Sequence, residues 1–127
     1  GVAFSTVWMD YTKEKNPDGK EFEGRLWILS DGTNASSAER LVQYGKGADF
    51  CTVVGTQTAG NGGSMANPAN MDAAMPNCGM LVRYSPFYFL NEDGTCNDLE
   101  GTHPDIEIES GETAMQRCLK EIKKLQK

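Results

Sequence analysis

Two short apolar runs separated by one amphipathic stretch constrain the fold of this chain most strongly. Leu26–Leu29 and Phe50–Gly55 have the composition of buried strands. Residues 35–46 between them carry apolar side chains at the spacing of one helix face, and Gly45 and Gly47 predict the end of that helix. A strand, a helix and a second strand in this order form a βαβ unit with parallel strands and a right-handed crossover. The sequence therefore predicts an α/β domain.

Further strands are expected on both sides of this unit. Val2–Met9 is rich in β-branched and aromatic residues, and strand character resumes over residues 78–90 with a break at Ser85-Pro86. Asn91–Gly94 is expected to be a turn, and Pro104–Ile108 a short strand at an edge of the sheet.

Residues 55–77 and the end of the chain complete the predicted organisation. Residues 55–77 are rich in Gly, Asn and Met and lack periodicity, which predicts a long loop near a functional site or a flexible connection. A helix is expected from about Glu112, with Ser110 as its cap. Its predicted buried face consists of Met115, Cys118, Leu119, Ile122 and Leu125.

Composition limits the classes of partner and cofactor. A chain of 127 residues fits one domain, and its net charge of −6 argues against nucleic acid or an anionic membrane as the main partner. No apolar run is long enough to span a bilayer. None of the four cysteines forms a close pair, so no metal site is expected. Cys78 and Cys96 flank the predicted hairpin, and a disulfide between them is left open.

The heptapeptide TNASSAE, residues 33–39, stands where the first strand turns into the helix. One interpretation is helix capping, because Thr, Asn and Ser are preferred cap residues. The other is catalysis by Ser36, whose hydroxyl would lie beside the free amides at the positive end of the helix. The Ser37 N–H would then help to stabilise an oxyanion formed when Ser36 attacks a carbonyl.

Three motifs in order resemble the S41 serine peptidases, the C-terminal processing or tail-specific protease family. The first is RLWILSDGTNASSAERLVQYGKGADFCTVVGTQTAGNGG, which matches a strand, Ala-Ser-x-x-Glu, a helix and a strand ending Val-Gly-x-x-Thr-x-Gly. MPNCGMLVRYSPFYFL resembles the hairpin that follows, and EGTHPDIEI resembles the Pro-Asp-Ile ending. The resemblance is strongest over residues 25–109 and implies a ClpP/crotonase-like superhelix. The whole chain, 1–127, is then expected to be one domain, the C-terminal part of the catalytic domain.

The resemblance implies a serine endopeptidase that acts on polypeptides without a cofactor. Ser36 falls on the family's nucleophile and Ser37 on the residue whose N–H serves the oxyanion hole, whereas Glu39 is expected to be structural. Processing proteases of the family use a lysine that corresponds to Asn61 here. Asparagine has no basic nitrogen, so a Ser-Lys dyad at this position is excluded. Nothing in the sequence directs Lys46 toward Ser36.

A second branch, resembling the tricorn core protease, uses serine, histidine and glutamate. Its histidine lies far upstream of the serine and is expected to lie outside this chain. Its glutamate corresponds best to Glu100, with Glu92 as a less favoured alternative. His103 is the only histidine and is expected to be a surface residue, with a role as the base as a weaker hypothesis.

Two other functions remain open at this stage. The lack of a lysine at Asn61 would also fit an inactive S41-like module that only binds peptides. A crotonase-type enzyme acting on acyl-CoA ranks last, because no basic residues for CoA are evident. The resemblance implies an extracytoplasmic location, secreted or at the cell envelope. A membrane would be reached only through segments outside the chain, and the oligomeric state is not predicted.

Overall fold

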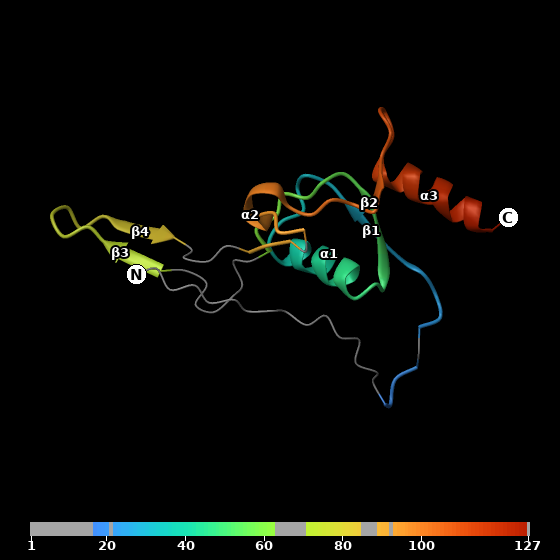
Figure 1. Ribbon diagram of the computed structural model, residues 1–127, viewed down its shortest axis with the longest axis horizontal. Coiled ribbons are helices and arrows are strands. Elements are labelled where there is room, and N and C mark those ends of the chain that lie inside the picture. Colours follow the sequence, from blue (N-terminus) through green and yellow to red (C-terminus); the bar gives the residue numbers. More distant parts are fainter. Residues whose placement is uncertain (1–16, 21, 63–70, 85–88, 92, 127) are drawn as a thin grey trace.

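The computed structural model describes residues 17–20, 22–62, 71–84, 89–91 and 93–126 (Figure 1). The strand predicted at Val2–Met9, the Ser85-Pro86 break and Glu92 lie outside the described residues. Strands and helices follow one another along the described chain as β1 (Leu26–Ser30), α1 (Ser37–Gly47), β2 (Cys51–Gly55), β3 (Met71–Ala74), β4 (Leu81–Tyr84), α2 (Asn97–Glu100), β5 (Ile106–Glu107) and α3 (Ala114–Leu125).

The predicted βαβ unit is confirmed. β1 and β2 pair in parallel with Ile28 opposite Val53, and α1 connects them. β5 pairs in parallel with the other side of β2, which gives a three-stranded sheet in the order β1-β2-β5. The strand expected within Pro104–Ile108 is therefore present, and it lies at an edge of this sheet.

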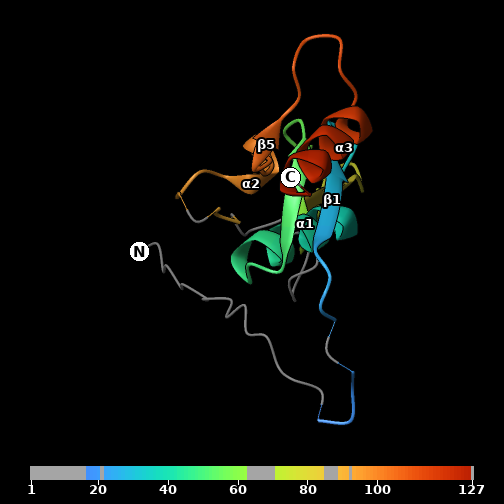
Figure 2. The same ribbon diagram turned by 90° about the vertical axis from the view of Figure 1, so that its right-hand side faces the viewer.

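The core is built around β2, which is covered on both faces. Val53 and Val54 are both completely buried, and neighbouring strand residues point to opposite faces of a sheet. Helix α1 approaches one face so closely that a Cβ at Gly45 would lie 2.3 Å from the Cys51 sulfur. Helix α3 packs against β1 and β2, and Figure 2 shows it beside these strands. Two helices thus hold the central strand in place.

The hairpin β3–β4 forms a second, separate antiparallel sheet, which lies apart from the parallel sheet in Figure 1. Its first strand corrects the prediction that residues 55–77 form one long loop. Met71–Ala74 has no apolar alternation and is exposed throughout, so only its pairing with β4 makes it a strand. Cys78 lies in the exposed connection between β3 and β4, and both Cys78 and Cys96 are free thiols.

The C-terminal helix is confirmed, but its cap and buried face differ from the prediction. Thr113, not Ser110, caps α3, because the Thr113 hydroxyl accepts the Gln116 N–H while the Gln116 side chain accepts the Thr113 N–H. Of the predicted apolar face, Cys118 is buried and Ile122 is half-buried. The other three residues are about half exposed, at 53% for Met115, 49% for Leu119 and 53% for Leu125.

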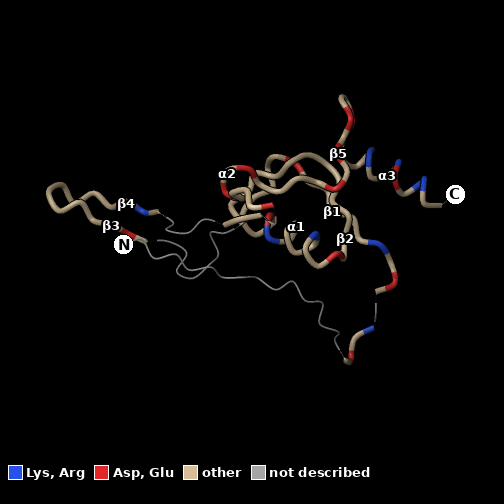
Figure 3. Tube along the Cα trace, in the orientation of Figure 1, with Lys and Arg blue, Asp and Glu red and all other residues tan. Residues whose placement is uncertain are grey.

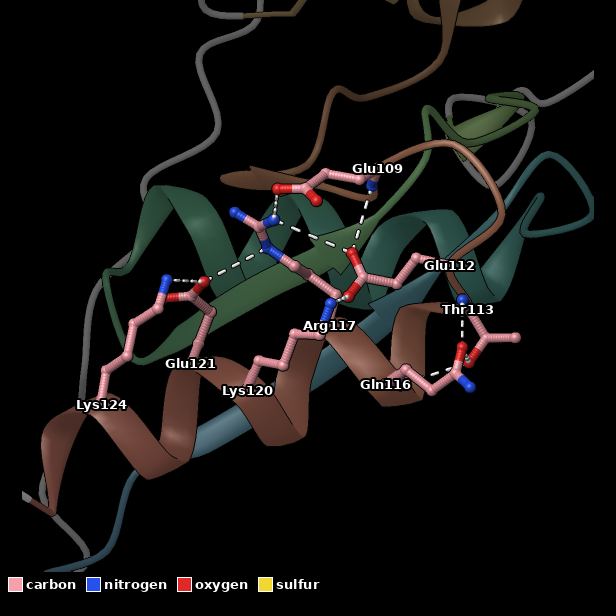
Figure 4. Close-up of polar contacts among 8 residues, drawn as sticks. All are labelled: Glu109, Glu112, Thr113, Gln116, Arg117, Lys120, Glu121 and Lys124. Atoms are coloured by element: carbon pink, nitrogen blue, oxygen red, sulfur yellow. Dashed lines mark hydrogen bonds and ion pairs between the residues drawn. The ribbon is translucent and has the colours of Figure 1, made fainter.

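Several ion pairs lie along α3. Arg117 pairs with Glu109 and Glu121, and Lys120 pairs with Glu112 at 2.6 Å (Figure 4). Figure 3 shows charges of both signs along this helix, whereas the described part of the hairpin carries only Asp72 and Arg83. None of the helices in the described ranges has the length and apolar character needed to cross a membrane.

Candidate active site

Ser36 occupies a backbone conformation that residues with a side chain rarely adopt. It precedes the first residue of α1 and has φ 58° and ψ −117°. Its N–H donates to the Gly60 carbonyl over 3.1 Å, and its own carbonyl accepts the Arg40 N–H over 3.0 Å as the first helical hydrogen bond. Its side chain makes no capping hydrogen bond to the helix. The capping interpretation therefore does not account for the Ser36 hydroxyl.

The other polar residues of the TNASSAE segment shape the turn before Ser36. The Asp31 carboxylate accepts hydrogen bonds from the Thr33 N–H and hydroxyl, and the Asn34 side chain accepts the Asp31 N–H over 2.7 Å. The Thr33 hydroxyl is the largest influence that holds the pKa of Asp31 below its ordinary value. The side chains of Thr33 and Asn34 thus form hydrogen bonds within the turn. This turn leads the chain from β1 to Ser36.

Ser37 is the first residue of α1 and is exposed. Amides in the first turn of a helix have no acceptor within the helix and lie at its positive end. The Ser37 N–H is therefore a suitable donor for negative charge that develops next to Ser36. The oxyanion role of Ser37 stays a prediction.

A turn after β2 lies directly beside Ser36. Ala35 pairs in parallel with Gly60, and the Ala59 N–H donates to the Asn34 carbonyl over 2.8 Å. Gly60 has φ 78°, and a Cβ there would lie 1.9 Å from the Asn97 carbonyl oxygen. Asn61, which the sequence resemblance matches to the family's lysine, is exposed with φ 62°, which asparagine tolerates better than most residues. An amide at this position supplies no general base.

Lys46 is engaged at the opposite end of α1 from Ser36. Its ammonium group lies 3.0 Å from an Asp105 carboxylate oxygen and donates to the His103 carbonyl over 2.7 Å. The other Asp105 oxygen accepts the Val53 N–H over 2.8 Å. Lys46 therefore anchors the segment before β5 to α1.

Glu100 is the last residue of α2, a four-residue helix that the sequence did not predict. The Glu100 carbonyl accepts a hydrogen bond from the Gln57 amide, and its side chain is exposed. The Thr58 N–H donates to the Thr102 carbonyl over 3.1 Å. Residues 58–60 consequently lie between the segment that carries Ser36 and the segment that carries Glu100. Among the described residues no hydrogen bond joins the Ser36 and Glu100 side chains.

Comparison with known proteins decides the family. The family model of Peptidase family S41 matches residues 5–108. The chain belongs to peptidase family S41. A search of curated proteins finds no match.

Solved structures show the same fold. Mature CPAF matches over 65% of this chain and 15% of its own, with 25% identity and a TM-score of 0.50. Mature CPAF complexed with lactacystin matches over 87% and 21%, with 22% identity and a TM-score of 0.59. A peptidase candidate from Parabacteroides merdae matches over 83% and 34%, with 20% identity and a TM-score of 0.62. The chain therefore spans about a third or less of these structures, as expected for part of an S41 catalytic domain.

The S41 Ala-Ser-x-x-Glu motif ends in a completely buried glutamate. One Glu39 carboxylate oxygen accepts hydrogen bonds from the Asn97 amide, over 2.6 Å, and from the Thr102 hydroxyl. Asn97 is also completely buried, and its side-chain oxygen accepts the Gly62 N–H over 3.0 Å. Glu39 is thus held by contacts within the protein, and its structural role stays a prediction. Sequence reasoning missed Asn97 and Thr102, because no local pattern marks residues that act through partners about sixty positions away.

His103, the weaker candidate for the base, is exposed. It lines a shallow hollow of about 260 Å³ together with Gln57, Glu107 and other residues, and Ser36 does not line this hollow. In the described ranges, no group of three or more His, Cys, Asp or Glu side chains is placed to hold a metal ion.

Proposed function

We propose that the chain supplies the nucleophile of an S41 serine endopeptidase that cleaves polypeptides through an acyl-enzyme. The observation that carries the proposal is the strained backbone of Ser36 at the start of α1, with no capping role for its hydroxyl. Strain of this kind persists only where the surroundings enforce it, and it is concentrated at functional sites. The nucleophiles of unrelated hydrolases also stand at strained strand-to-helix turns.

The first half of the reaction uses the start of α1. The Ser36 oxygen attacks the carbonyl carbon of the scissile bond, and its proton passes to a general base. Negative charge develops on the carbonyl oxygen, where the Ser37 N–H and the positive end of α1 stabilise it. When the tetrahedral intermediate collapses, the carbon–nitrogen bond breaks and the amine leaves with the proton returned by the base. A water molecule then hydrolyses the acyl-enzyme by the same route.

The general base is proposed to be a histidine outside this chain, oriented by Glu100. Two observations on this chain support that choice. Asparagine stands at position 61, where the family resemblance places the lysine of the processing proteases, and Lys46 is held by Asp105 and the His103 carbonyl. Glu100 is exposed on a segment separated from that of Ser36 only by residues 58–60, so its carboxylate is available to a histidine entering from elsewhere.

A second candidate is an inactive S41-like module that binds peptides, which the asparagine at position 61 favours. The two functions differ in turnover. We expect the full-length protein to hydrolyse a fluorogenic protein substrate and Ser36→Ala to abolish that activity. Ser37→Ala keeps the N–H and should retain activity, so it serves as the matched control. Peptide binding without hydrolysis, unchanged in Ser36→Ala, would instead establish the binding module.

The extracytoplasmic location remains an expectation from the family resemblance. It would be tested by fractionating cells that express the full-length protein.

A further inference from the structure

Asn97 joins four separate parts of the chain although its side chain is completely buried. Its amide nitrogen donates to Glu39 of α1 over 2.6 Å and to the Asn91 side-chain oxygen over 3.0 Å. Its side-chain oxygen accepts the N–H of Gly62, in the turn beside Ser36. Its own backbone forms the first residue of α2, where its carbonyl accepts the Gly101 N–H over 2.8 Å. A buried amide with this many partners fixes the relative position of all four parts.

Glu39 supplies the other half of this connection. It lies three residues after Ser36, in the first turn of α1, and is completely buried. One carboxylate oxygen accepts hydrogen bonds from the Asn97 amide and the Thr102 hydroxyl. The other oxygen is buried with no hydrogen-bond partner among the described residues. Removing a carboxylate from water is costly unless it is well paired. Such an arrangement is more readily explained by a positioning requirement than by stability alone.

These contacts lead from the nucleophile to the candidate acid. Glu39 belongs to α1, the helix that directly follows Ser36. Asn97 is the first residue of α2, and Glu100 is its last. We propose that Glu39 and Asn97 are positioning residues, which hold the α2 turn and its Glu100 at the correct place relative to Ser36. This inference rests on the proposed peptidase function, and it adds two residues that act through Glu100 rather than on the substrate.

The hydrogen bond between Glu39 and Asn97 can be tested by exchanging its donor and its acceptor. Asn97→Asp replaces the donor that faces Glu39 with a second carboxylate, so two acceptors of like charge would meet in a buried place. In the double variant Glu39→Gln/Asn97→Asp, the glutamine amide can donate to the aspartate, which restores one donor and one acceptor. Asn77→Asp makes the same substitution at an exposed position in the connection between β3 and β4 and serves as the control.

The experiment measures kcat and KM of the full-length protein on a fluorogenic peptide, together with the thermal midpoint of each variant. We expect Asn97→Asp to lower kcat by about 100-fold, the scale for a misplacement of roughly 1 Å, while KM changes little. The double variant should regain at least about tenfold of that loss, as coupled residues do. Asn77→Asp should match the wild type.

The pH profile separates positioning from a purely structural role. If Glu100 is displaced, it stabilises the imidazolium less, so the acidic limb of kcat/KM should move to lower pH. Thr102→Val removes the other donor to Glu39 with little change of shape and should move the limb in the same direction. Should Asn97→Asp fail to fold, Thr102→Val and the double variant decide the question.

Two results would overturn this inference. One is a folded Asn97→Asp or Thr102→Val variant with the kcat and pH profile of the wild type. The other is a folded double variant that regains nothing over a folded Asn97→Asp. In both cases a wild type that loses all hydrolysis through Ser36→Ala would leave the proposed function intact. A wild type without Ser36-dependent hydrolysis would instead overturn the proposed function itself.

Discussion

At the scale of single residues, the site depends on one serine in a conformation suited to glycine. Ser36 is forced into positive φ because its N–H is bound to Gly60 and its carbonyl begins the hydrogen bonds of α1. Positions held in such sparsely populated regions cost about 1–3 kcal/mol each. The strained backbone carries a hydroxyl that does not cap the helix, as the proposed role of Ser36 as nucleophile requires.

This strain predicts an inverted order of stability for two substitutions of Ser36. Inside a helix or strand, a protein with alanine is normally more stable than the same protein with glycine by about 0.5–1 kcal/mol. Here we expect Ser36→Gly to be more stable than Ser36→Ala by about 1 kcal/mol, because glycine reaches φ 58° and ψ −117° without strain. Urea denaturation of the two inactive variants measures the difference. The usual order, with alanine ahead, would show that the backbone at Ser36 is not strained.

The motif in the sequence pointed to Ser36 as a candidate, but the sequence did not reveal the hydrogen bonds around it. TNASSAE indicated a strand-to-helix junction and left capping and catalysis open, because both use the same residue types. Only the fold shows that Thr33 and Asn34 form the turn while the Ser36 side chain does not cap the helix. The buried pair Glu39–Asn97 was beyond sequence reasoning because its members become neighbours only after folding.

At the scale of elements, the sequence predicted those helices and strands that have a regular local pattern, but not those that depend on tertiary contacts. β1, α1 and β2 follow from apolar runs and helical periodicity, which are local properties of the chain. α2 is four residues long and depends on the buried contacts of Asn97, so no local periodicity announces it. The cap of α3 was misassigned because Ser110 and Thr113 are both cap residues, and only Thr113 is followed at the right spacing by Gln116.

Asp105, which lies just before β5 and contacts α1, allows a prediction about the hydrogen bond of a buried backbone N–H. The Asp105 carboxylate takes the Val53 N–H of the central strand and pairs with Lys46. Asp105→Ala should destabilise the protein by about 1–3 kcal/mol, because it leaves a buried N–H unpaired. Asp105→Asn keeps the acceptor and loses only a partly exposed ion pair, so its cost should stay below about 1 kcal/mol. Equal costs in chemical denaturation would contradict this assignment.

The ion pairs of α3 predict an acid-sensitive contribution to stability. The Lys120 ammonium group holds the pKa of Glu112 below its ordinary value. A lowered pKa in the folded state means that the pair stabilises at neutral pH and that this stabilisation is lost as the pH falls below the ordinary range of a glutamate. Glu112→Gln should therefore lower the thermal midpoint at about pH 7 and have much less effect at about pH 3. A difference that does not change with pH would exclude this pair as its source.

At the scale of the whole molecule, the chain leaves much apolar surface uncovered. Leu41 and Tyr44 of α1 are 53% and 42% exposed, and Met115, Leu119 and Leu125 of α3 are exposed to a similar degree. The chain spans 15–34% of the solved structures that it matches. We therefore expect further parts of the protein to pack on these helices, and with them to bring the histidine to the Ser36 end of α1.

This expectation predicts how a charge on α1 affects the full-length protein. Leu41→Glu would cost little at a half-exposed position, but it should destabilise by more than about 2 kcal/mol if the rest of the protein buries it. Leu41→Met keeps the apolar character and should be close to neutral. Thermal unfolding of both variants measures the contrast. Equal midpoints would show that this face of α1 stays in contact with water.

The most direct test of the account is covalent labelling of the full-length protein with a fluorophosphonate, followed by mass spectrometry of the peptides. The account predicts one adduct on Ser36, none in Ser36→Ala, and unchanged labelling in Ser37→Ala. If Ser36 stays unmodified after long incubation while a control serine peptidase is fully labelled, Ser36 is not an activated nucleophile and the peptidase proposal is wrong.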